Sequence, residues 1–286
     1  MKGGEKDQEE GREAHGTKGD GSAHDGFRTK VGHEEMWEGH GSEYRPWTVR
    51  VNAADRAMSA EAFPHRPPSG ASPLDPSLRI RLTRPGDIPG VIRLSHRVYG
   101  PEGAWLTPEV RSHQRVFPEG QLVVVRRDSG RIVGLAVSLV IVSDAFPLEA
   151  SWNRITARGH LTTHDLAEGD TLYGAGVAVH PDVRGMGVGR ALYGAREAMV
   201  RRLGLARIRA GARISGYHRV AGQLTPRQYV DEVVAGRRRD PTLSFQLHMG
   251  FRVVAIAPNY LPQDRESRGH AAVVEWTPDP DGGIRG

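Results

Sequence analysis

Residues 172–204 read LYGAGVAVHPDVRGMGVGRALYGAREAMVRRLG and hold the most informative pattern in the chain. Residues 172–179 form an apolar run that stops before Pro181, a residue that cannot donate to a sheet ladder. After a glycine-rich segment, apolar residues recur at spacings of 4, 3, 4 and 4, at Val188, Leu192, Ala195, Met199 and Leu203. Such spacing gives one apolar stripe on a helix, and Gly204 stands where a left-handed C-cap is commonest. The pattern predicts a strand, a tight turn and a helix over residues 188–203.

The glycine-rich turn has the features of an anion site. Gly185, Gly187 and Gly189 remove side chains where the free amides at the start of a helix point outward, and the helix dipole favours negative charge there. Arginines on both flanks can add charge-assisted hydrogen bonds. The predicted contacts to a diphosphate are Arg184, Gly185, Met186, Gly187, Val188, Gly189 and Arg190.

Two familiar phosphate-binding patterns do not fit this turn. The spacing G-x-G-x-G differs from the G-x-G-x-x-G dinucleotide fingerprint, and no lysine follows the glycines as it does in a P-loop. A glycine-rich turn without a ligand is the structural alternative. The flanking arginines favour the anion site, because they serve no folding purpose there.

The rest of the chain divides into a polar arm and a folded part. Residues 1–76 are rich in Gly, His, charged residues and finally Pro, show no periodicity, and are predicted to be a disordered arm with a linker. Strands are expected over 78–83, 121–125, 132–142, 172–179, 207–210, 252–257 and 271–276, with helical segments over 86–98, 188–203 and 225–249. This order predicts one α/β domain with a mixed central sheet, over residues 77–280.

Composition excludes several classes of protein. The chain has no cysteine, which rules out disulfides, thiolate catalysis and Cys-ligated metals, and fits a cytoplasmic location. No apolar run approaches the ~18–20 residues that cross a membrane, and no secretory signal is expected. Residues 1–77 hold 10 Lys and Arg against 14 Asp and Glu, and residues 78–286 hold 29 against 20. A basic folded part suits a phosphorylated cofactor, an anionic surface or nucleic acid. Residues 237–239 form an arginine triplet, but no aromatic residues interleave it, so no nucleic-acid partner is expected.

The run VAVHPDVRGMGVGRAL resembles the coenzyme-A-binding motif of the GNAT acetyltransferase superfamily, R/Q-x-x-G-x-G/A. Arg184, Gly187 and Gly189 match its signature positions, and the predicted element order fits the whole folded part. The segments SWNRIT, THDLAEGDTLYG, AGARISGY, DPTLSFQLHMGF and PNYLPQD are similar to the GNAT domain that precedes a nitrilase-type amidase in some bacterial fusion proteins. The amidase half is not expected within these 286 residues.

The resemblance implies N-acetyl transfer from acetyl-CoA to a primary amine, of a small molecule or a protein, by direct attack. The pantetheine arm would lie along the backbone at Val177 and Val179, where two strands splay apart, and the diphosphate would rest on the turn. No metal is expected. His160 and His164 are four residues apart but lack the Glu of the zinc-protease pattern. A homodimer, or an amidase as a separate partner, is a further expectation.

The proton-transfer residues are harder to assign. Many family members have a Tyr four residues before the Gly of a Gly-Phe pair, where it protonates the leaving thiolate, but Gln246 stands there in this chain. Tyr217 is the substitute chosen for this proton donor, with Tyr229 and Ser244 also open. For the base, the strand before the glycine-rich turn offers Tyr173 and no carboxylate. Glu149, Asp165, Glu168 and Asp170 are possible bases that are more often solvated loop charges. Gln246 also favours the alternative function, a non-catalytic acyl-CoA sensor that partners an amidase.

Overall fold

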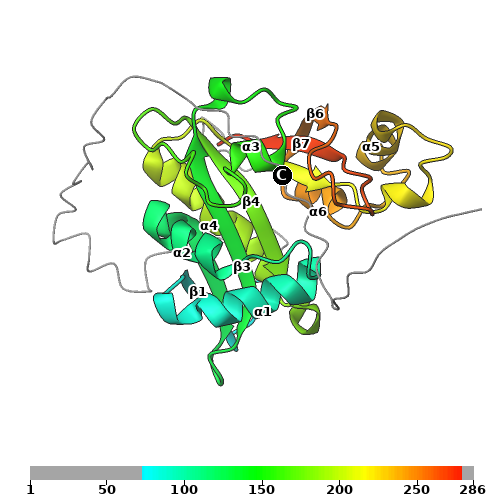
Figure 1. Ribbon diagram of the computed structural model, residues 1–286. Helices are drawn as coiled ribbons and strands as arrows, with labels where there is room; N and C mark the ends of the chain where they lie inside the picture. The colour runs from blue at the N-terminus through cyan, green and yellow to red at the C-terminus, as the bar shows by residue number, and fades with distance from the viewer. Residues whose placement is uncertain (1–72, 279–286) are drawn as a thin grey trace, which may run out of the picture. The chain divides into compact units, whose positions relative to one another are not determined.

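The computed structural model describes residues 73–278, and a seven-stranded mixed sheet forms their centre (Figure 1). The predicted arm over residues 1–76 lies outside the described residues except for its last four. The strands are β1 Leu78–Leu82, β2 Gln121–Arg126, β3 Ile132–Ile141, β4 Thr171–Val179, β5 Arg207–Arg213, β6 Arg252–Ala257 and β7 Ala271–Trp276. Their order across the sheet is β1-β2-β3-β4-β5-β7-β6. Only β4 and β5 pair in parallel, and every other neighbouring pair is antiparallel.

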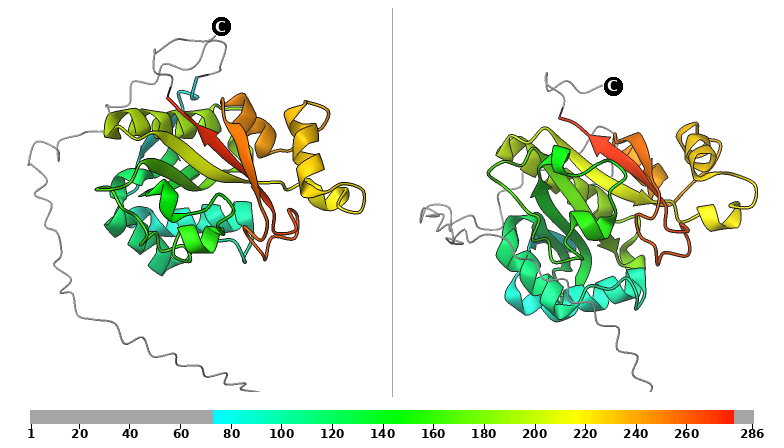
Figure 2. Two further views of the ribbon diagram at one scale, coloured as in Figure 1. Left: turned by 90° about the horizontal axis from the view of Figure 1, so that it is seen from above. Right: turned by 45° about the horizontal axis from the view of Figure 1, so that its top comes forward.

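Helices cover both faces of the sheet (Figure 2). The α-helices are α1 Ile88–Tyr99, α2 Thr107–Val116, α3 Trp152–Ile155, α4 Val188–Leu203, α5 Pro226–Val234 and α6 Leu243–His248. Short 3-10 turns occupy Pro85–Asp87, Pro118–Gly120, Ser143–Ala145, Pro181–Val183 and Tyr217–Arg219. Among the described residues, no helix is both long and apolar enough to cross a membrane.

The sheet is buried on both faces because its strands alternate between two cores. In β2, Val123 and Val125 pack toward α1 and α2, whereas Leu122 and Val124 pack toward α4. This two-sided burial explains why β2 and β3 read as continuous apolar runs rather than as alternating ones. The result is a layered α/β domain, as the element order predicts.

Most predicted elements are confirmed, and the differences have physical reasons. Helix α4 and strands β6 and β7 have the predicted bounds, while the predicted helical region over 225–249 consists of α5 and α6 with a turn between them. Helix α2 was not predicted, because its buried face includes Ser112 and His113 and so shows no apolar stripe. Strand β5 runs three residues further than predicted, to Arg213.

Candidate active site

Strands β4 and β5 separate halfway along their length. They pair only from Thr171 with Arg207 to Gly174 with Ala210. Beyond that point β5 stays with β7, and β4 stays with β3 through a bulge in which Gly174 faces Ser138 and Gly176 faces Val137. Residues 175–179 of β4 therefore present an edge with no strand partner among the described residues, and Val177 and Val179 lie on it. An unpaired edge can accept an extended ligand as an additional strand.

The turn that follows β4 requires glycine for two reasons. Gly187 is the N-cap of α4 and has a φ of 79°, and Gly185 has a φ of 82°. A Cβ on Gly187 would also lie 2.5 Å from the carbonyl oxygen of Pro73. Left-handed backbone and close approach of another chain segment both exclude larger residues. The glycines that predicted the turn are thus required by its geometry.

The amides of this turn are free to bind an anion. In the part of the chain that the structure describes, the N–H groups of Gly185, Gly187, Val188, Gly189 and Arg190 donate to no protein acceptor. Arg184 is exposed, and open space surrounds Gly185. Free amides at the start of a 16-residue helix, with two adjacent arginines, form an anion receptor.

Met186 has a different role within the turn. Its N–H donates to Val183, and its carbonyl accepts from the N–H of Asp75 at 3.1 Å. Its side chain packs with Leu74 against the core beneath α4. Met186 therefore holds the turn in place, whereas its neighbours leave their amides open.

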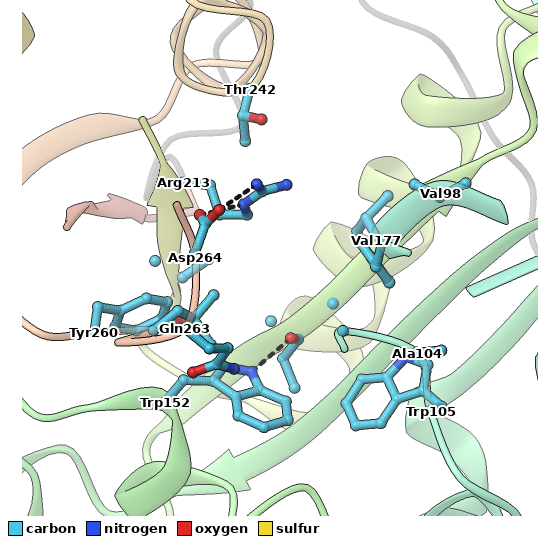
Figure 3. A pocket seen from close by; sticks show the side chains of 18 of the residues that line it. Val98, Ala104, Trp105, Trp152, Val177, Arg213, Thr242, Tyr260, Gln263 and Asp264 are labelled. Carbon is cyan, nitrogen blue, oxygen red and sulfur yellow. Dashed lines mark hydrogen bonds and ion pairs between the residues drawn. The ribbon is translucent and has the colours of Figure 1, made fainter. Parts of the chain in front are cut away.

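A cavity of about 740 Å³ occupies the separation between β4 and β5 (Figure 3). Val177 lines it on the β4 side, and Arg213 lines it on the β5 side. Trp105 and Trp152 close one end with ring centroids 5.4 Å apart, and the indole N–H of Trp152 donates to the carbonyl of Ala175 at 2.9 Å. The cavity thus lies directly beside the free edge of β4.

The β5 wall of the cavity carries a network of charges. Arg213 donates from Nε and Nη2 to the two carboxylate oxygens of Asp264, both at 2.6 Å, and from Nη2 to Glu266 at 2.9 Å. Burial acts to raise the pKa of Asp264, but the hydrogen bonds from Arg213 and Ser267 hold it below its usual value. Asp264 therefore stays ionised and fixes the loop between β6 and β7 against β5.

A buried arginine forms part of the opposite wall. Arg196 of α4 is 1% exposed and lines the cavity. Its Nε donates to Ser138 Oγ at 3.0 Å, and its Nη2 donates to the carbonyls of Val137 and Gly176, each at 2.8 Å. A Cβ on Gly174 would lie 2.9 Å from Nη1, which explains the glycine there. No described carboxylate lies within 4.0 Å of Arg196, so its charge is balanced only by neutral acceptors.

Two further polar side chains meet beside Arg196. Gln246 of α6 and Tyr193 of α4 both line the cavity, and Gln246 Nε2 donates to Tyr193 Oη at 2.8 Å. Arg196 and Tyr193 are not among the site residues expected from the sequence. The burial of Arg196 could have been predicted from the sequence, because it falls on the apolar stripe of α4, four residues after Leu192 and three before Met199. An arginine on the buried face of a helix marks a special position.

The two tyrosines chosen from the sequence lie elsewhere. The Tyr173 hydroxyl is hydrogen-bonded to that of Tyr260 in the core, and the Tyr217 hydroxyl donates to the carbonyl of Leu224 at 3.0 Å. Neither residue is among those that line the cavity. The Tyr217 hydroxyl thus serves packing away from the cavity, whereas the Tyr173 hydroxyl lies behind Tyr260, which does line the cavity.

Three of the acidic and histidine candidates from residues 143–170 have structural partners, namely Asp165, Asp170 and His164. Asp165 accepts the N–H groups of Ala167 and Glu168, and Asp170 accepts from Ser143. His164 accepts the N–H of Val140, and its ring stacks on Phe117. None of these residues lines the cavity. The polar segment over 143–170 thus supports the site without contributing these side chains to it.

Comparisons with known proteins agree with the fold and with the motif. The model of the acetyltransferase (GNAT) family matches residues 91–220. The uncharacterized N-acetyltransferase YkwB of Bacillus subtilis (strain 168) is 31% identical over 204 residues, which cover 70% of this chain and 88% of that protein. The probable hydrolase YhcX of the same organism is 39% identical over 197 residues, which cover 69% of this chain but only 38% of that protein.

Solved structures show the same architecture. The GphF GNAT-like decarboxylase in complex with isobutyryl-CoA is 27% identical, with a TM-score of 0.59, over 70% of this chain and 98% of that chain. The loading GNATL domain of CurA from Lyngbya majuscula has a TM-score of 0.59 at 18% identity, over 70% of this chain and 97% of that chain, and shows the fold alone. The split sheet and the turn of free amides define an acyltransferase architecture. The chain belongs to the GNAT acetyltransferase family, and its enzyme class is that of an N-acetyltransferase.

Proposed function

We propose that the protein transfers an acetyl group from acetyl-CoA to a primary amine, on a small molecule or a protein, by direct attack in a ternary complex. The observation that carries this proposal is the continuous path from the free β4 edge to the free amides of the turn. The pantetheine arm would pair with the backbone at Val177 and Val179 as an added strand. The diphosphate would rest on residues 184–190. A cytoplasmic location, expected from the absence of cysteine, is part of the proposal.

The cavity supports the chemistry of the transfer. Beyond Gly174 the backbone of β4 has no strand partner on the β5 side, so an N–H group of this edge could donate to the oxyanion that forms from the thioester oxygen. Glu102 and Glu109 line the same cavity, and either carboxylate can accept the proton of the attacking amine, directly or through water. Holding both reactants beside β4 converts a bimolecular reaction into an effectively unimolecular one.

The test combines binding with turnover. Calorimetry with CoA should give a saturable isotherm, and incubation of acetyl-CoA with a panel of small amines, amino acids and peptides should release free CoA thiol. Thiol reagents suit this assay, because the chain contributes no cysteine of its own. Failure to bind CoA would refute the proposal. CoA binding without release of thiol on any amine would instead favour the sensor that partners an amidase, an alternative to which the longer hydrolase relative lends support.

A second candidate concerns the donor. The GphF structure is named a decarboxylase, and the Arg196 guanidinium in the cavity wall has no described carboxylate partner. Together these observations support an acyl-CoA whose acyl group carries a carboxylate that is lost as CO2. Incubation with malonyl-CoA in the absence of an amine, with the CoA products identified by mass spectrometry, would distinguish the two donors, since only the second candidate produces acetyl-CoA and CO2.

A further inference from the structure

The leaving thiolate of CoA needs a proton, and Gln246 cannot supply one. The neighbour of Gln246 can, because Gln246 Nε2 donates to the hydroxyl oxygen of Tyr193 at 2.8 Å. The two side chains come from α6 and α4, 53 residues apart in the sequence, and both line the cavity. Tyr193 is 4% exposed and Gln246 is 3% exposed, so both are desolvated. A phenolic hydroxyl is thus in hydrogen-bond contact with Gln246 at the wall of the cavity.

Packing fixes the orientation of this hydroxyl. The Tyr193 ring makes edge-to-face contacts with Phe245 and Phe251, each with centroids 5.5 Å apart. Since Gln246 donates to Oη, it occupies a lone pair and leaves the O–H proton for another acceptor. Among the described residues, no acceptor takes that proton. Gln246 Oε1 is likewise buried without a hydrogen-bond partner among the described residues. The Tyr193 proton and Gln246 Oε1 are therefore both available to a bound ligand.

Two neighbouring groups would stabilise a phenolate at Tyr193. Burial raises the pKa of Tyr193 above its ordinary value, so the hydroxyl holds its proton at rest, and the charge of Arg196 and the hydrogen bond from Gln246 only partly offset that rise. The Arg196 guanidinium carbon lies 5.5 Å from the ring centroid. Tyr99 of α1 is the other titratable group that faces this cluster, and burial raises its pKa as well, so it stays neutral. A phenolate formed at Tyr193 would therefore meet one cation and one N–H donor.

We propose that Tyr193 is the catalytic acid that protonates the departing CoA sulfur, with Gln246 and Arg196 as positioning residues. The inference rests on the proposed acetyl transfer. When the tetrahedral intermediate collapses, the C–S bond breaks and its electron pair goes to sulfur. The Tyr193 Oη–H proton moves to that sulfur to give the CoA thiol. The phenolate then recovers a proton from the ammonium product or from water.

The decisive variant is Tyr193→Phe. It should lower kcat for acetyl transfer about 100-fold or more, while the Kd for CoA changes less than about threefold, because the hydroxyl acts only in the transition state. Tyr217→Phe is the matched control, since its buried hydroxyl lies outside the cavity, and it should keep kcat. Tyr193→Phe alone leaves the buried Gln246 amide without its partner, which can destabilise the fold. The double variant Tyr193→Phe with Gln246→Met removes both polar groups at nearly constant volume, so a loss of kcat in it cannot be assigned to an unpaired amide.

A rescue experiment separates catalysis from packing. In the Tyr193→Phe background, Gln246→Tyr returns a hydroxyl to the same place from α6 and should recover at least about tenfold in kcat. If Tyr193→Phe keeps the kcat of the unaltered protein, the inference is wrong while the transferase proposal stands. If the unaltered protein transfers no acetyl group at all, both fail together.

Discussion

The two walls of the cavity are built by different means. The β4 side continues beyond the cavity into the turn at residues 184–190, and its groups for binding CoA are backbone amides and a free strand edge, kept accessible by glycines. The side chains of Tyr193 and Arg196 from α4 line the cavity beside them. On the β5 side, the functional groups are side chains, above all Arg213 with Asp264 and Glu266. Where backbone groups bind the ligand, affinity is sensitive to substitutions that change the backbone conformation and less sensitive to substitutions that change side-chain charge. A site made of side chains can change its partner by substitution while the fold stays the same.

The largest effect is expected where the backbone wall is broken. Gly187→Ala should weaken CoA binding about 100-fold, because the new Cβ forces either φ away from 79° or residues 73–75 away from the turn. Calorimetry with CoA measures this directly. Gly204→Ala is the matched control, with a φ of 66° at the opposite end of the same helix and open space around it. It should cost about 1 kcal/mol of stability and leave CoA affinity unchanged. Equal loss of affinity in both variants would contradict a local role for the turn.

The predictability of the fold follows the same division. The turn from β4 to α4 could be read from the sequence, because Gly185 and Gly187 are required by local geometry. Helix α2 could not, because burial of Ser112 and His113 depends on carbonyl acceptors at His160 and Gly159, almost fifty residues away. A backbone conformation that only glycine adopts can be predicted from the sequence, whereas hydrogen bonds between polar groups far apart in the chain cannot.

The next effect tests the side-chain wall. Arg213→Met should raise the KM for the amine acceptor about tenfold, because Asp264 loses its partner and the loop between β6 and β7 loosens. The Kd for CoA should hold, since the β4 wall is untouched. Arg227→Met provides the control, because its pair with Asp231 is exposed on α5 and contributes little. A loss of CoA affinity in Arg213→Met, with an unchanged KM for the amine, would reverse the assignment of the two walls.

The candidate catalytic residues could not be found from the sequence for a similar reason. Gln246 was recognised as a departure from the family pattern, but its contact with Tyr193 joins two helices that no local pattern connects. Tyr217 and Tyr173 are predicted from residue type and neighbourhood alone, whereas in the structure the Tyr217 hydroxyl donates to Leu224 and the Tyr173 hydroxyl contacts that of Tyr260. Only Arg196 carried a local signal, as a charge on the buried stripe of α4.

A smaller effect is expected from Arg184, the more exposed of the two arginines that flank the free amides of the turn. Arg184→Ala should weaken CoA binding about fivefold, since an exposed arginine adds a screened, charge-assisted contact to amides that remain in place. The loss should shrink as salt rises from 0.05 to about 0.5 M. Arg237→Ala, an exposed arginine beyond the end of α5, should change nothing in the same titration. A 100-fold loss for Arg184→Ala would mean that side-chain charge, not backbone, dominates this wall.

The smallest effect concerns stability beneath the tryptophans. His113 contacts the edge of Trp105 at 4.7 Å between centroids, and its Nε2 is bonded to the carbonyl of Gly159 at 2.6 Å. Burial lowers the pKa of His113 to about 4 from an ordinary 6.5. Between pH 6.5 and pH 4, His113 is protonated in the unfolded chain but neutral in the folded one. The free energy of unfolding is therefore highest above pH 6.5 and falls as the pH drops toward 4.

Between pH 7 and pH 6, protonation of His113 in the unfolded chain should lower the free energy of unfolding by about 0.7 kcal/mol. His113→Gln keeps a neutral donor for Gly159 and should lose that part of the slope, whatever its stability at pH 7. Denaturant titrations of both proteins at the two pH values measure the difference. Parallel slopes would mean that the folded protein admits the proton, and with it water, beneath Trp105. In that case water would reach the end of the cavity that Trp105 and Trp152 close, and this end would not favour the neutral form of an amine acceptor.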